Sequence, residues 1–153
     1  MGKREGREPL LLFETYGQEN LRSEDYMSKK ILVVDDEPDF MRIFLTKLKN
    51  NGYEGLSATN GKEAIKEAQL QKPDLIVMDI VMPDMHGTDA VRLLQADTRT
   101  ANIPIIFISG EIVNLPENEE TRQAIINGKS FTAIAKPFKA ETLISEIKKL
   151  IKD

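Results

Sequence analysis

The sequence predicts an α/β fold with a parallel sheet whose two faces are both covered by helices. Strand-like apolar runs alternate with helix-like segments five times along the chain, the pattern of βαβ units joined by right-handed crossovers. The clearest runs, at residues 31–34, 75–78 and 105–108, are apolar throughout. Such strands have no polar side to turn toward water, so we expect them at the centre of the sheet.

The composition is that of an ordinary globular protein. A chain of 153 residues with 41% apolar and 30% charged residues is long enough to bury one real core. A net charge of -4 gives no reason to expect nucleic-acid binding. The sequence has no cysteine, which excludes disulfides and thiolate metal sites. Its single histidine, His86, argues against a histidine-based metal site and against a Ser/His/Asp catalytic triad. We expect a cytoplasmic protein, because the sequence shows no secretory signal. We expect no membrane association, because no apolar run approaches the ~20 residues of a spanning helix.

The first 28 residues differ from the rest. They combine mixed charges and three glycines with little hydrophobic periodicity, a composition typical of weakly ordered segments. We therefore predict an N-terminal extension over residues 1–28 and a single folded domain over residues 29–153.

The first half of this domain predicts three strands and two helices. Pro38 suits the first turn of a helix, and Asn51-Gly52 suits its end. Asn60 is placed to cap a second helix that runs to about Gln71. The strands are expected at residues 31–34, at residues 53–58 as a weak edge strand, and at residues 74–79.

The second half predicts two more strands and three helices. A helix is expected to begin at Thr88 or Asp89, after a loop rich in turn-forming residues. A long acidic stretch follows the fourth strand and leads to a short helix ending at about Asn127-Gly128. The remaining elements are strands at residues 103–108 and 131–136 and a final helix at residues 140–151.

Polar residues stand just past the strand ends. Asp35 and Asp36 follow the first strand, Asp79 ends the third, Ser109 ends the fourth and Lys136 ends the fifth. Parallel strands bring their carboxyl ends to one edge of the sheet, where ligands of open α/β folds bind. We therefore expect these five side chains to converge.

Their chemistry indicates phosphoryl transfer. Three carboxylates in one pocket repel each other unless a cation lies among them, and oxygen ligands favour a hard ion such as Mg²⁺. An ammonium from Lys136 and a hydroxyl from Ser109 complete a set that can position and neutralise a phosphoryl group. Asp79 would be the nucleophile that forms an aspartyl phosphate.

The chain from about Lys29 onward resembles the receiver domain of two-component response regulators, of the chemotaxis-regulator kind. The matching residues are Asp35-Asp36-Glu37, Asp79 with Met82-Pro83 and Gly87, Ser109-Gly110, and Lys136-Pro137-Phe138. The resemblance implies a flavodoxin-like (βα)5 doubly wound sheet with strand order 2-1-3-4-5.

The resemblance also implies roles. Asp79 would take a phosphoryl group from a sensor histidine kinase, and Lys136 and Ser109 would contact it. Mg²⁺ would bind Asp36, Asp79 and the main-chain carbonyl of Val81, with Asp35 acting largely through water. The protein would be a phosphoacceptor that assists its own phosphorylation and dephosphorylation and not an enzyme, either a monomer or a phosphorylation-dependent dimer. A downstream protein would bind the face formed by the fourth helix, fifth strand and fifth helix.

Two features depart from the family pattern. Ala133 stands where the family usually has an aromatic residue, and Phe131 would lie on the same face of a regular strand; whether it substitutes stays open. The interval from Ser109 to Lys136 is longer than usual, and the extra length is expected within residues 111–120. Both departures fall on the side of the fold that would report phosphorylation.

Two other functions remain open. One is a receiver-like scaffold that never uses phosphate. The other is a Mg²⁺-dependent phosphatase of the haloacid dehalogenase type, although that class wants an acid at the position of Val81. No output domain is visible after the last helix of the given sequence, so the chain is either a stand-alone receiver, which we expect, or a receiver excised from a longer protein.

Overall fold

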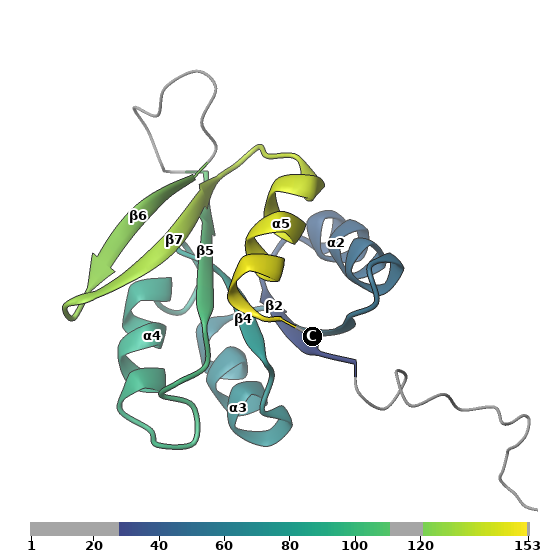
Figure 1. Ribbon diagram of the computed structural model, residues 1–153. Helices are drawn as coiled ribbons and strands as arrows, with labels where there is room; N and C mark the ends of the chain where they lie inside the picture. Colours follow the sequence, from purple (N-terminus) through teal and green to yellow (C-terminus); the bar gives the residue numbers. More distant parts are fainter. Residues whose placement is uncertain (1–27, 111–120, 153) are drawn as a thin grey trace, which may run out of the picture.

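The computed structural model describes residues 28–110 and 121–152. Their backbone forms one six-stranded sheet in the order β3-β2-β4-β5-β7-β6, flanked by helices on both faces (Figure 1). The strands are β2 (Lys30–Val34), β3 (Glu54–Ala58), β4 (Leu75–Asp79), β5 (Ile105–Ser109), β6 (Thr121–Ile126) and β7 (Lys129–Ala135). The helices are α2 (Pro38–Asn50), α3 (Gly61–Gln71), α4 (Gly87–Gln95) and α5 (Ala140–Leu150).

Five of the strands are parallel, and their order confirms the predicted fold. The neighbours β3-β2-β4-β5-β7 correspond to the expected order 2-1-3-4-5. Every residue of β4 and β5 is buried, as the uninterrupted apolar runs predicted. The weak strand β3 lies at one edge of the sheet, also as predicted.

Each face of the sheet has its own core. On one face, α3 and α4 pack through Ala64, Ala68, Val91 and Leu94 onto alternate strand residues. On the other face, α2 and α5 pack through apolar residues that include Phe44, Leu48, Leu143 and Ile147. This doubly wound arrangement leaves the carboxyl ends of the parallel strands free to carry polar groups.

Local signals at the helix ends act as predicted. Pro38 occupies the first turn of α2, and the side chain of Asn60 caps α3 by accepting a hydrogen bond from the Glu63 N–H at 2.8 Å. The helix expected from Thr88 or Asp89 begins slightly earlier, at Gly87.

The prediction of a short helix ending at Asn127-Gly128 is wrong for residues 121–126, the part of that segment that the structure describes. Residues 121–126 form β6, which pairs antiparallel with β7 in a two-residue hairpin. Asn127 and Gly128 both have positive φ, at 52° and 76°, as type I′ hairpin turns require. The same two residues can also end a helix, which is why the sequence misled. Consequently β6 lies at the outer border of the sheet, beside β7 (Figure 1).

Two predictions fall outside the described residues: the N-terminal extension, except for Ser28, and the extra length at residues 111–120. None of the helices in the described ranges is both long enough and apolar enough to cross a membrane.

Candidate functional site

Three carboxylates meet at the carboxyl ends of β2 and β4. Asp35, Asp36 and Asp79 each offer one oxygen, and these oxygens lie within 4.8 Å of one another. Asp35 and Asp79 are buried, at 1% and 7% exposure, whereas Asp36 is exposed. The structure therefore brings together the three acids that the sequence predicted, with one of them open to solvent.

Lys136 reaches this cluster from the end of β7. Its Nζ lies 2.7 Å from Asp35 Oδ2, 2.9 Å from Glu37 Oε1 and 3.5 Å from Asp79 Oδ2. The side chain of Lys136 is only 19% exposed, so its ion pair with the fully buried Asp35 is shielded from solvent. Three carboxylates thus contact a single ammonium.

Main-chain groups hold the two buried acids in place. The N–H of Val81 donates to Asp79 Oδ1 at 3.1 Å, and the N–H of Glu37 donates to Asp35 Oδ1 at 2.8 Å. Gly87 crosses directly over the end of β4, where an added Cβ would lie 2.5 Å from the carbonyl oxygen of Asp79. A larger residue at position 87 would therefore force the backbone at the end of β4 or in this loop to shift.

The local electrostatics favour a further cation. Burial raises the pKa of Asp79 above its ordinary value, and the nearby Asp35 adds to this, while the Val81 N–H and Lys136 oppose it. Burial works against the charge of Lys136, but its hydrogen bonds to Asp35 and Glu37 outweigh burial and raise the pKa of the ammonium. Lys136 therefore stays protonated, and the cluster keeps a net negative charge.

Comparisons with known proteins identify this arrangement. Residues 31–148 match the model of the response regulator receiver domain. The chain belongs to the response regulator receiver family. It is 36% identical over 121 residues to the protein PilH of Pseudomonas aeruginosa, covering 77% of this chain and 93% of that protein.

Solved receiver structures agree. The chemotaxis protein CheY4 of Vibrio cholerae matches with a TM-score of 0.68 and 28% identity, covering 81% of this chain and 99% of CheY4. The receiver domain of the sensor histidine kinase PA1611 from P. aeruginosa matches with a TM-score of 0.67 and 26% identity, covering 82% and 99%. That structure holds a magnesium ion in its active-site cleft. Receiver domains are generally non-enzymatic signalling domains that interact with histidine kinases and downstream effectors.

The donor set of this receiver fits Mg²⁺. Asp35, Asp36 and Asp79 present oxygen atoms only, and exposed Asp36 leaves one side of the cluster open to water. Mg²⁺ prefers carboxylate oxygens and keeps several of its waters. The net negative charge around Lys136 supplies the electrostatic reason for a divalent cation.

Ser109 lies on β5, and Phe131 and Ala133, the residues that depart from the family pattern, lie on β7. Ser109 is buried at the end of β5, directly after Ile108, which pairs with Asp79 of β4. Its carbonyl accepts a hydrogen bond from the Lys136 N–H at 2.9 Å. The structure thus places Ser109 at the predicted edge of the sheet.

Ala133 and Phe131 share one face of β7, as predicted. Both are buried in the core beneath α3 and α4, and the ring of Phe131 packs edge-to-face on Phe107 of β5, with centroids 5.7 Å apart. In this conformation Phe131 is therefore a core residue, two positions from the aromatic position of the family.

Sequence reasoning assigned no role to two neighbours of Lys136. Glu37 binds the ammonium directly, and the ring of Phe40 lies under it, 4.7 Å from the Nζ to the centroid. Both residues belong to the start of α2, where Pro38 fixes the helix. The acidic run from Asp35 to Glu37 was the available signal for Glu37, whereas no sequence signal pointed to Phe40.

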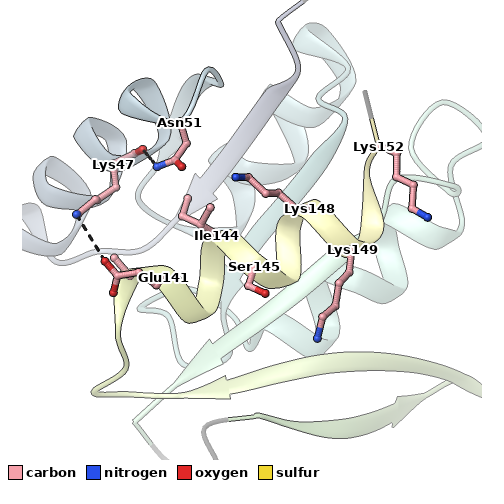
Figure 2. Close-up of a pocket in the computed structure, with 9 residues that line it drawn as sticks. Lys47, Asn51, Glu141, Ile144, Ser145, Lys148, Lys149 and Lys152 are labelled. Atoms are coloured by element: carbon pink, nitrogen blue, oxygen red, sulfur yellow. Dashed lines mark hydrogen bonds and ion pairs between the residues drawn. The ribbon is translucent and has the colours of Figure 1, made fainter.

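A large groove in the described structure lies away from this cluster. The groove, of about 780 Å³, runs between α2 and α5, and Figure 2 shows the side chains along it. Several of its lining residues are lysines, namely Lys47, Lys148, Lys149 and Lys152. None of the predicted site residues lines this groove, so it is separate from the acidic cluster.

Proposed function

We propose that Asp79 accepts a phosphoryl group from the phosphohistidine of a sensor histidine kinase, in a Mg²⁺-dependent reaction, and that phosphorylation switches the binding of a protein partner. The observation that carries this proposal is the position of the Asp79 carboxylate. It lies in one cluster with Asp35 and Asp36 and 3.5 Å from the ammonium of Lys136.

The transfer requires little chemistry from the protein besides positioning. One oxygen of Asp79 forms a bond to phosphorus while the bond between phosphorus and the imidazole nitrogen breaks, and that nitrogen keeps the electron pair. Asp35, Asp36, Asp79 and the main-chain carbonyl of Val81 would hold Mg²⁺, which supplies neutralisation of the negative charge on the phosphoryl oxygens. The Val81 N–H keeps the Asp79 carboxylate oriented.

Lys136 is the residue whose contacts would change most. It is now closer to Asp35 and Glu37 than to Asp79. A phosphoryl group on Asp79 adds negative charge on that side, so the ammonium would shift its strongest contact toward the phosphoryl oxygens. Ser109 would donate a hydrogen bond to the same group from the end of β5.

The partner surface would differ from the one expected from the family resemblance. The described residues before β7 form strand β6 and a turn, where a fourth helix was expected. The face that reports phosphorylation would therefore consist of β6, β7 and α5.

Phosphorylation can be tested directly. The protein is incubated with acetyl phosphate or a phosphorylated kinase, with Mg²⁺ or with EDTA, and phosphoprotein is quantified by intact mass. We expect Mg²⁺-dependent incorporation that is lost in Asp79→Asn and retained in Asp89→Asn, whose carboxylate is exposed on α4 and paired with Arg92. Equal labelling of both variants, or no labelling at all, would contradict the proposal.

A phosphate-independent scaffold is the second candidate, and one observation favours it. Strand β6 replaces part of the family's usual reporting surface, so partner binding need not depend on Asp79. Comparing partner capture by the wild type and Asp79→Asn separates the two: equal capture with and without phosphoryl donor supports the scaffold.

A further inference from the structure

Within the described residues, strand β6 ends the sheet with an edge that pairs with no further strand. It is the last strand in the order, and β7 is its only partner among the described strands. The six residues of β6 include no proline or glycine and only one charged side chain, that of Arg122. Ile125 exposes 69% of its surface there. Proteins usually protect such an edge with charges, proline or a cover.

The hairpin determines which backbone groups point outward. In a two-residue hairpin the residues flanking the turn, Ile126 and Lys129, exchange both hydrogen bonds, and bonded and non-bonded pairs then alternate. The outward-facing groups of β6 therefore belong to Thr121, Gln123 and Ile125. A separate hydrogen bond supports this assignment. The Lys136 N–H, just after β7, donates to Ser109 of β5. Even-numbered residues of β7 therefore direct their backbone groups toward β5, and odd-numbered residues direct theirs toward β6.

We propose that this edge pairs antiparallel with β6 of a second copy of the chain, joining two sheets across a two-fold axis. Centred on Gln123, the pairing sets Thr121 opposite Ile125 of the other copy, and each bonded pair exchanges two hydrogen bonds, about six in total. No other register centred within β6 bonds all three outward-facing residues.

The side chains permit this register. Arg122 lies opposite Ala124 of the second copy, so no like charges face each other; a shift of the centre to Arg122 would oppose two arginines. The side chain of Gln123 turns inward along the sheet, where its amide binds Ser130 Oγ at 2.7 Å and Thr132 Oγ1 at 3.3 Å. It therefore leaves the outer edge clear. Ile125 lies opposite Thr121 of the other copy, a residue type that favours strands.

The other edge of the sheet is a poorer candidate. Strand β3 carries exposed Glu54 and contains Gly55, where an added Cβ would lie 2.7 Å from the side chain of Leu45. A glycine and an acid in five residues weaken strand pairing. The second copy is favoured over an unrelated strand because β6 is complementary to itself.

Sedimentation velocity of the full chain, without phosphoryl donor, tests this inference independently of the proposed function. The decisive variant is Gln123→Pro, which removes an outward N–H and is compatible with the β6–β7 bonds. Gln123→Ala is the matched control, because it removes the same side-chain contacts and keeps the N–H.

We expect the wild type and Gln123→Ala to dimerise with a concentration dependence within about threefold of each other, whereas Gln123→Pro weakens dimerisation about tenfold to hundredfold through the loss of the two central bonds. Circular dichroism and urea denaturation confirm that each variant is folded. The proposal is overturned if the wild type stays monomeric up to concentrations on the order of 100 μM. It is also overturned if Gln123→Pro and Gln123→Ala dimerise with equal dissociation constants.

Discussion

Replacing Lys136 with methionine tests the electrostatics of the site most sharply. Methionine keeps most of the length of the side chain and removes the ammonium, including its contact with the ring of Phe40. The change leaves the fully buried Asp35 carboxylate without its partner at 2.7 Å, which costs about 1.5–3 kcal/mol for a charged hydrogen bond. The bond to Glu37, whose side chain is 62% exposed, adds less than about 1 kcal/mol. We therefore expect a loss of about 2 kcal/mol in the free energy of unfolding when EDTA is present.

Urea denaturation measures this loss, and a melting curve should show a fall on the order of 8 °C for a domain of this size. Added Mg²⁺ should reduce the deficit, because a divalent cation neutralises the acids that Lys136 no longer screens. Lys149→Met is the matched control: its ion pair with Glu146 leaves the lysine 67% exposed, so its removal should cost less than about 1 kcal/mol.

A double-mutant cycle assigns the loss to the Asp35 contact. With Asp35→Asn in the background, Lys136→Met should cost at least about 1 kcal/mol less than in the wild type. A coupling energy near zero, or a Lys136→Met variant as stable as the wild type in EDTA, would refute the account of the cluster.

Three further predictions concern the loops and the pKa of Asp79. Because its pKa is raised above 3.8 in the folded state, ionised Asp79 destabilises the fold. Asp79→Asn should therefore be more stable than the wild type at pH 7 in EDTA, with the difference disappearing as pH falls below about 4; a pH-independent difference would contradict this. Gly87→Ala should cost about 1–3 kcal/mol, since its Cβ meets backbone of Asp79 and Ile80, whereas Gly110→Ala, with open space around it, should change urea stability little. Gly128→Val, at a φ of 76°, should cost about 1–2 kcal/mol and speed amide exchange selectively in the β6–β7 hairpin, while unchanged exchange would mean that the turn does not control β6.

The apolar runs of β2, β4 and β5 were sufficient to predict that these strands lie at the centre of the sheet, whereas the full strand order followed from the resemblance to receiver domains. The sequence was equally sufficient for the positions of Asp35, Asp36, Asp79 and Lys136, since every parallel strand ends at the same edge. These are consequences of local pattern combined with one topological rule.

The rest depended on tertiary pairing. Asn127-Gly128 is compatible with a helix end and with a hairpin turn, and residues 121–126 show no strand alternation: only Ile126 is buried. The pairing with β7 therefore decides the structure of this segment. The contact between Glu37 and Lys136 spans 99 residues, so only the folded sheet brings the two together.

The central claim, that Asp79 is the phosphoacceptor, is tested most directly by locating the modified residue. Borohydride reduces an acyl phosphate to an alcohol, which converts a phosphorylated aspartate to homoserine that peptide mass spectrometry can identify. After incubation with acetyl phosphate and Mg²⁺, the account predicts homoserine at residue 79 and unmodified aspartate at residues 35 and 36. Homoserine at either of those positions, or none at residue 79 in a protein that has taken up phosphate, would contradict it.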